Sequence, residues 1–195
     1  MKATQILLIA VLGLVLGGLA GLGYKLVTEE EAAQGSEASD AVKLLGAIPD
    51  FSFPDLQGQV RNGREWRDRI LVLNFWAAWC PPCREETPMF LELQKKYAND
   101  NVRFVGIAID DKQPVQDFVD TLGVEYPVLL GDLQAIGLSR QLGNRFEGLP
   151  FTVVAEPGGK VILRHQGGIS REELEPVLKQ AIEGSHRTYA AAERI

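Results

Sequence analysis

The chain has 195 residues, of which 46% are hydrophobic and 24% charged, a composition that allows one ordinary globular domain with appendages. Its formal net charge of −6 and the lack of a basic cluster argue against a nucleic-acid surface. The two cysteines are too few for a disulfide framework. The two histidines are distant in sequence and lie in unlike contexts, so we do not expect a zinc site.

An uninterrupted apolar run extends from Ile6 to Gly23. As a helix it would be roughly 27 Å long, close to the hydrocarbon thickness of a bilayer. We therefore expect residues 1–25 to be a retained membrane anchor, with a cytoplasmic N-terminus and an exported C-terminal domain. An uncleaved or a cleaved signal peptide is the alternative. Glycines recur at every fourth position of the run and would permit helix–helix self-association.

The sequence after the apolar run changes in composition. Residues 26–46 are acidic, rich in small polar side chains and without apolar periodicity, so they predict a flexible linker. Apolar periodicity then begins, and residues 47–184 are predicted to form one folded domain. Residues 185–195, which follow Gly184, are expected to be a frayed tail.

Strand and helix patterns alternate through the predicted domain. Phe51, Phe53 and Val60 flank a turn at residues 54–58 and predict an N-terminal hairpin. The alternation ends in an antiparallel hairpin and a last helix, which indicates an α/β layer with a mixed sheet. Strands are expected at 70–76, 102–109, 126–130, 151–155 and 161–165, and helices at 84–96, 114–122, 132–142 and 170–182.

Both cysteines stand between the strand at 70–76 and the helix after it, in the sequence Trp79-Cys80-Pro81-Pro82-Cys83. This spacing lets two sulfurs close a short disulfide, and a helix N-terminus stabilises a thiolate. The arrangement predicts a dithiol redox centre. We expect Cys80 to cap the helix at the surface and to attack first, and Cys83 to lie within the helix and resolve the mixed disulfide.

With the segment from Asn74 to Pro88 and the later Gly148-Leu149-Pro150-Phe151-Thr152, the chain resembles a thioredoxin, in particular the membrane-anchored TlpA-like and ResA-like disulfide reductases. The likeness covers about residues 48–182. It implies a thioredoxin fold with an N-terminal hairpin extension and a central insert at residues 110–131. It also implies that the Cys80–Cys83 disulfide is the redox centre, with no further cofactor.

The same resemblance implies a location and partners. Family members pass electrons from a membrane donor of the DsbD or CcdA type to oxidised protein thiols outside the cytoplasm. They serve cytochrome c maturation, copper-site assembly or general thiol repair, and the sequence does not decide among these. The expected location is the bacterial inner membrane, in a single pass, with the C-terminal domain in the periplasm or an equivalent extracytoplasmic space.

Two polar positions near the dithiol follow the family pattern. Where thioredoxin has a buried aspartate, this chain has Asn74, whose amide cannot relay a proton as a carboxylate can. Glu86 stands three residues after Cys83, where the TlpA-like and ResA-like proteins carry a glutamate. The resemblance implies that Glu86 exchanges a proton with Cys83 or tunes both thiols. A carboxylate that only complements the helix dipole is the alternative, which Glu85 fits better.

Substrate contacts are expected from both sides of the dithiol. The likeness implies a cis Leu149–Pro150 bond beside it, which leaves the backbone of Leu149 free to pair with an extended substrate. Trp79 is expected to form an apolar rim, with plain core packing as the alternative. Pro81 and Pro82 complete the expected substrate-binding set.

The direction of electron flow follows from the surroundings of Cys80. The prolines at 81 and 82 remove two amide donors, and Glu85 and Glu86 add negative charge, so an extremely acidic thiolate is not expected. We therefore predict a reductant of exported disulfides. The alternatives are a disulfide donor, a membrane-tethered docking or metallochaperone protein, and a peroxidase of the same superfamily.

Overall fold

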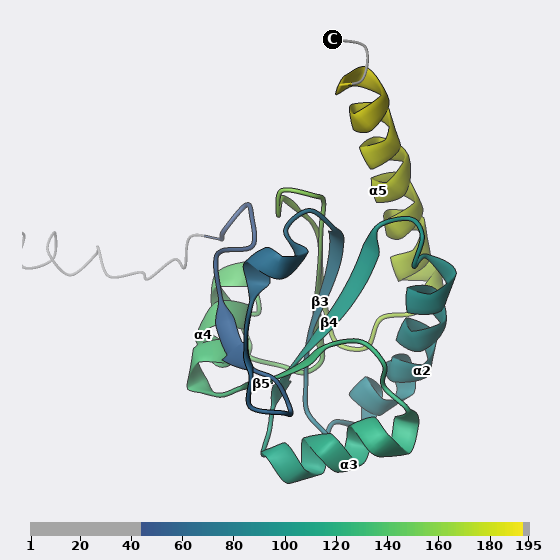
Figure 1. Ribbon diagram of the computed structural model, residues 1–195. Coiled ribbons are helices and arrows are strands. Elements are labelled where there is room, and N and C mark those ends of the chain that lie inside the picture. The colour runs from purple at the N-terminus through teal and green to yellow at the C-terminus, as the bar shows by residue number, and fades with distance from the viewer. Residues whose placement is uncertain (1–43, 193–195) are drawn as a thin grey trace, which may run out of the picture. The chain divides into compact units, whose positions relative to one another are not determined.

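A computed structural model describes the backbone of residues 44–192 and the side chains of residues 44–187. A mixed five-stranded sheet has the order β5-β4-β3-β6-β7 and carries helices on both faces (Figure 1). The described elements are β1 (Ser52–Pro54), β2 (Val60–Asn62), a 3₁₀ turn (Gly63–Trp66), β3 (Ile70–Trp76), α2 (Pro81–Lys96), β4 (Val102–Ile109), α3 (Lys112–Leu122), β5 (Val128–Gly131), α4 (Leu133–Leu142), β6 (Phe151–Ala155), β7 (Val161–Gln166) and α5 (Arg171–Ala192).

The central strand β3 is buried along its whole length. It pairs in parallel with β4 and antiparallel with β6. Alternate side chains of β3 enter two separate cores, one beneath α2, α3 and α5 and the other beneath α4 (Figure 1). A strand covered on both faces is apolar at nearly every position, which explains why the run at 70–76 was recognisable in the sequence. The predicted α/β class and thioredoxin fold with a mixed sheet are confirmed.

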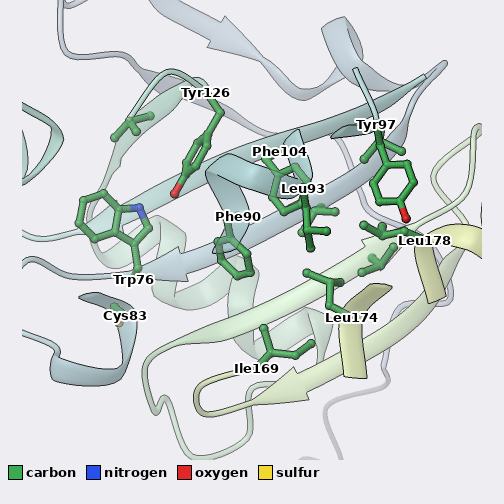
Figure 2. Packing of buried hydrophobic residues seen from close by; sticks show 14 of the residues in the cluster. Trp76, Cys83, Phe90, Leu93, Tyr97, Phe104, Tyr126, Ile169, Leu174 and Leu178 are labelled. Atoms are coloured by element: carbon green, nitrogen blue, oxygen red, sulfur yellow. The ribbon is translucent and has the colours of Figure 1, made fainter. Parts of the chain in front are cut away.

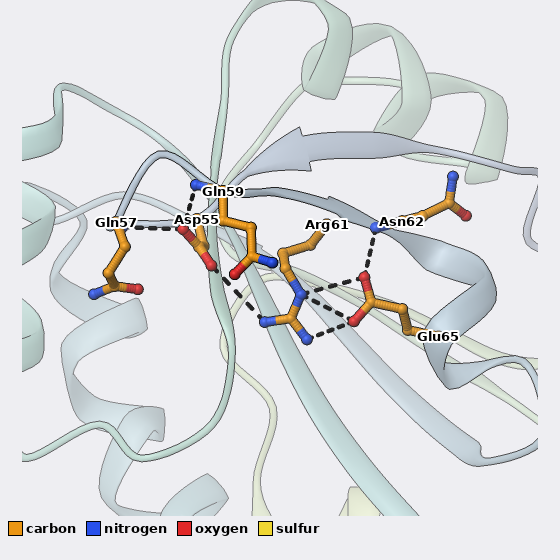
Figure 3. Close-up of polar contacts among 6 residues, drawn as sticks. All are labelled: Asp55, Gln57, Gln59, Arg61, Asn62 and Glu65. Carbon is orange, nitrogen blue, oxygen red and sulfur yellow. Dashed lines mark hydrogen bonds and ion pairs between the residues drawn. The ribbon is translucent and has the colours of Figure 1, made fainter.

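The N-terminal hairpin extension is also present. β1 and β2 form their own antiparallel sheet, separate from the main one. Asp55 closes the turn between them, since its Oδ1 accepts hydrogen bonds from the backbone N–H groups of Gln57 at 3.0 Å and Gln59 at 2.9 Å. The guanidinium of Arg61 donates a hydrogen bond to Oε2 of Glu65, and its Nη1 lies 3.8 Å from Oδ2 of Asp55 (Figure 3). Asp55 also forms an antiparallel bridge with Leu129, which places the hairpin beside the edge strand β5.

The segment at 110–131, expected to be an insert, supplies α3 and the edge strand β5. α3 begins at Lys112, earlier than the predicted start at Pro114. Proline is tolerated in a first turn because the amide N–H that it lacks has no partner inside the helix there. Gly123 ends α3 with a φ of 64°, as its position in the sequence indicates.

The end of α5 differs from the prediction. The helix was expected to stop near Ile182 and to be followed by a tail at 185–195, but it continues to Ala192. Gly184 lies inside it and is not among the glycines with positive φ. A single glycine costs a helix only about 1 kcal/mol relative to alanine, and three alanines follow it, so the helix continues.

The expected anchor at residues 1–25 and nearly all of the expected linker at 26–46 lie outside the described residues. Within residues 44–192, the helices are too short or too polar to cross a membrane.

Candidate active site

Three loops meet at the edge of the sheet where β3 ends. The first joins β3 to α2 and carries the dithiol. The second precedes β6, whose Phe151 pairs with Phe75 of β3, and the third follows β7, whose Gln166 pairs with Phe151. Gly168 of the third loop lies so close to α2 that a Cβ on it would be 3.3 Å from Cβ of Pro82. The third loop therefore packs against the start of α2.

Cys80 and Cys83 form a disulfide at this start, with an S–S distance of 2.04 Å. Cys80 is the N-cap of α2 in an extended conformation, and its Sγ accepts a hydrogen bond from the backbone N–H of Cys83 at 3.4 Å. Pro81 and Pro82 occupy the first two helical positions and have no N–H to offer. The sulfur of Cys80 thus has one backbone donor in the first turn.

The expectation that Cys80 lies at the surface is wrong for the disulfide form. Cys80 is 2% exposed and Cys83 1% exposed. The disulfide and the hydrogen bond from Cys83 hold the sulfur of Cys80 against the first turn of α2 instead of toward solvent. Exposure therefore does not distinguish the two cysteines while they are joined, and the order of attack stays a prediction.

Glu86 follows Cys83 by three residues on α2 and is only 5% exposed. Its Oε1 accepts a hydrogen bond from Nδ2 of Asn74 at 2.9 Å, and its Oε2 accepts one from the backbone N–H of Ile169 at 3.0 Å. Burial outweighs these two bonds and raises the pKa of Glu86 from 4.5 to about 7. A carboxyl group with this pKa can gain or lose a proton at neutral pH.

A groove of about 550 Å³ leads to Glu86 between α2 and the loop before α5. Gly168, Ile169 and Ser170 form one wall, and Pro82 and Met89 of α2 form part of the other. The groove gives the buried carboxyl a route for proton exchange with solvent. Glu85, by contrast, is exposed, as expected of a residue that only complements the helix dipole.

The two tryptophans near the dithiol have different environments. Trp76 is 3% exposed and packs against Phe118, with their ring centroids 4.3 Å apart. Trp79 is 69% exposed and lines a second groove, of about 370 Å³, with Arg84 and residues of α3. Core packing therefore accounts for Trp76 and does not account for Trp79, whose rim role remains a prediction.

The loop before β6 contains a cis Leu149–Pro150 bond, as the family likeness implies. Sequence reasoning missed the residue that supports this loop, Asn144, which is 1% exposed. Its Nδ2 donates to the carbonyl of Gly148 at 3.0 Å, and its Oδ1 accepts from Nε2 of Gln166 at 3.0 Å. Its position directly after the glycine that ends α4 was the only available signal. Thr152 was missed as well, because its role depends on its cross-strand neighbour Asn74.

Comparisons with known proteins agree with this geometry. The Redoxin family model matches residues 45–182. The chain is 29% identical over 184 residues to the thiol-disulfide oxidoreductase ResA of Bacillus thuringiensis, with 92% of this chain and 98% of that protein covered. It is 32% identical over 134 residues to the thioredoxin-like protein YneN of Bacillus subtilis, which covers 67% of this chain and 75% of that protein.

A solved structure is similar too. A thiol:disulfide interchange protein of the thioredoxin family from Chlorobium tepidum superposes with a TM-score of 0.64 at 28% sequence identity, and covers 70% of this chain and 95% of that one. Within the described part of the chain, histidine, cysteine, aspartate and glutamate side chains form no group of three or more that would hold a metal ion.

Proposed function

This chain belongs to the Redoxin family and is a thiol-disulfide oxidoreductase, and from that premise we propose that it works mainly as a reductant of oxidised protein thiols outside the cytoplasm. The observation that carries the direction is the donor arrangement at Cys80. A strong oxidant destabilises its disulfide by stabilising a very acidic thiolate. Here the first two helical residues are prolines, and among the described residues only the N–H of Cys83 donates a hydrogen bond to the sulfur.

The reaction proceeds in two exchanges. In the reduced protein, the thiolate of Cys80 attacks a substrate disulfide, forms a mixed disulfide and releases one substrate thiolate. Cys83 then loses its proton, attacks the sulfur of Cys80 and re-forms the Cys80–Cys83 disulfide, while the second substrate thiolate leaves and takes up a proton. Two electrons pass from the protein to the substrate, and the dithiol is left oxidised.

Glu86 is the proposed proton acceptor for Cys83. The two residues are three apart on α2 and so lie on one helix face. The pKa of Glu86, raised to about 7 by burial, matches the task of accepting a thiol proton near neutral pH and returning it through the groove beside it.

The proposed substrate contacts lie on the loops around the dithiol. Among the described residues, the backbone of Leu149 makes none of the loop hydrogen bonds, which leaves its N–H and C=O available to an extended segment. Pro150 and the two prolines at 81 and 82 would form the floor beneath that segment, and Trp79 would form its rim.

The apolar run at 6–23 supports the remaining parts of the proposal. An anchor there would place the domain outside the cytoplasm, where cytosolic reductants do not reach it. Regeneration of the dithiol would then require a membrane electron donor, for which the DsbD and CcdA types are the candidates. Cytochrome c maturation is one process in which such a reductant would act.

The deciding measurement is the reduction potential of the purified full-length protein against glutathione, together with its reduction of insulin in the presence of a dithiol. We expect insulin reduction and a potential well below that of the strongly oxidising members of the fold, which is about −120 mV. A potential near that value would make the protein a disulfide donor. A folded protein that fails to reduce insulin would instead favour a docking or metallochaperone role.

A further inference from the structure

The hydrogen-bond partners of Asn74 distinguish this site from a thioredoxin site. Asn74 lies on β3 directly opposite Thr152 of β6, and its side chain is 4% exposed. Its Nδ2 donates to Oε1 of Glu86 at 2.9 Å and to Oγ1 of Thr152 at 3.0 Å. A side-chain amide has two N–H bonds, and both are used.

Thr152 determines which way the amide faces. Because its Oγ1 accepts one N–H of Asn74, the other N–H is directed toward Glu86. Thr152 is fully buried, so no solvent competes for this bond. The hydroxyl therefore acts on Glu86 through Asn74, without touching the carboxyl group in the bonds that the structure shows.

The charge of Glu86 depends on its burial and on the polar groups that donate hydrogen bonds to it. Among the described residues, the causes of its pKa shift are burial, which raises the pKa, and the hydrogen bonds from Ile169 and Asn74, which lower it; none of these causes is a cation. Cys83 lies three residues before Glu86 on the same helix, and among the described residues Tyr126 interacts with this carboxyl group: the pKa of Tyr126 is raised by burial and by the charge of Glu86. Three charged side chains, Glu85, Glu92 and Arg171, line the adjacent groove.

We propose that Asn74, oriented by Thr152, is a positioning residue that sets the proton occupancy of Glu86 and thereby the pH range in which the thiols react. This proposal rests on the proposed function, and it says how the pH dependence of the same active site is controlled. An N–H donated to Oε1 stabilises the ionised carboxylate. An ionised Glu86 disfavours the neighbouring thiolates, so Asn74 holds the thiol pKa values up.

An aspartate at position 74 would have a different consequence. Two carboxyl groups at the 2.9 Å separation seen for Asn74 and Glu86 would share one proton at neutral pH, and their titrations would be coupled. The amide instead leaves Glu86 as the single titrating carboxyl of the pair. Asn74 thus replaces a proton-carrying group with a fixed donor.

The test compares five full-length variants: Asn74→Leu, Thr152→Val, Thr152→Ser, Glu86→Gln, and the double variant that combines Asn74→Leu with Glu86→Gln. The pKa of Glu86 is measured by carboxyl carbon NMR on the disulfide form, in which no thiol titrates. Loss of one charge-assisted hydrogen bond should raise that pKa by about one in Asn74→Leu. Thr152→Val should raise it by less, and Thr152→Ser, which keeps the hydroxyl, should restore the wild-type value.

The second readout is the pH dependence of alkylation of Cys80 in the reduced protein. Its midpoint should move to lower pH in Asn74→Leu, because Glu86 then stays protonated as the thiol ionises. In the Glu86→Gln background the same Asn74→Leu change should cause no further shift, since it acts only through the carboxyl group. An equal shift in both backgrounds, or an unchanged pKa of Glu86 in Asn74→Leu and Thr152→Val, would overturn the proposal.

These outcomes are separable from the proposed function. The NMR titration requires only folded, oxidised protein, and Thr152→Val provides a milder change if Asn74→Leu fails to fold. Variants that reduce insulin with the wild-type pH profile would refute the role of Asn74 and leave the reductase function standing. If the wild-type protein does not reduce insulin but the variants show the expected shifts in the pKa of Glu86, the role of Asn74 would be supported and the reductase function refuted.

Discussion

Two buried or half-buried glutamates lie at opposite ends of the interface between α2 and α5, and they are held in opposite ways. At the dithiol end, Glu86 accepts hydrogen bonds from an amide side chain and a backbone N–H, and its pKa is raised to about 7 by burial. At the far end, Glu175 accepts from Nζ of Lys96 at 2.6 Å and from the hydroxyl of Tyr97 at 2.6 Å. Its pKa is lowered to about 2, chiefly by the bond from Lys96. Figure 2 shows Cys83 and Tyr97 at opposite ends of the intervening core.

The difference shows what makes a carboxyl group useful for proton transfer in this fold. Both glutamates are hydrogen-bonded, so hydrogen bonding alone does not separate them. Glu175 has a cation beside it and stays ionised throughout the physiological range. Among the described residues no cation contributes to the pKa of Glu86, so burial keeps this carboxyl group close to the point where its neutral and ionised forms are equal. In the proposed mechanism the perturbed pKa of Glu86 serves proton transfer, whereas the perturbed pKa of Glu175 reflects an ion pair with Lys96.

The sharpest test of this contrast is removal of the dithiol. Cys80→Ser and Cys83→Ser should each reduce insulin reduction to the background rate, because each exchange step needs its own sulfur. Glu175→Gln should retain activity within about twofold, since the far end takes no part in the reaction. The measurement is insulin precipitation at fixed dithiol concentration with full-length variants.

A further observation separates the roles of the two cysteines. Cys83→Ala should accumulate mixed disulfides with substrate proteins through Cys80, whereas Cys80→Ala should not. Equal trapping by both variants would contradict the assigned order of attack.

The second test concerns stability and has an intermediate expected size. The folded state keeps a proton on Glu86 up to about pH 7, whereas the unfolded chain releases it near the ordinary value of 4.5. The free energy of unfolding of the oxidised wild-type protein should therefore fall as pH rises from about 4.5 to about 7. Glu86→Gln removes this loss, so its stability relative to wild type should increase by about 3 kcal/mol across that window.

Urea unfolding at the two ends of the window measures this change. Glu85→Gln is the matched control, because Glu85 is the adjacent residue on the same helix and is exposed. A difference between Glu86→Gln and wild type that stays constant with pH would show that Glu86 is ionised in the folded protein, as Glu175 is.

Much of the fold was predictable because its elements carry strong local signals. The buried strand at 70–76 is apolar without interruption, and Gly123 and Gly143 mark the ends of α3 and α4. The end of α5 was not predictable in this way, since a glycine lowers helix stability without stopping the helix.

The site was predictable only in part. The dithiol and Glu86 share one short segment, so their spacing in the sequence gives their spacing on the helix. The hydrogen-bond partners of Glu86 could not be predicted from this spacing, because Asn74 comes from β3 and Ile169 from the loop before α5. Burial of Cys80 was missed for another reason, since the cysteine spacing alone does not show that the disulfide and the hydrogen bond from Cys83 hold its sulfur against the first turn of α2.

The smallest expected effect belongs to the far end of the interface. Because the pKa of Glu175 is lowered, its ion pair should stabilise the folded state above about pH 4.5, and this contribution should disappear as pH falls toward 2. Glu175→Gln should therefore lower the Tm at pH 7 by about 2 °C or less, since the pair with Lys96 is accessible to solvent and screened by salt. Thermal unfolding at low and high salt tests this, with the exposed Glu172→Gln of the same helix as control. A Tm loss that persists in high salt and at pH 2 would mean that Glu175 stabilises the protein through packing. The two glutamates would then not differ in the way that the ion pair with Lys96 predicts.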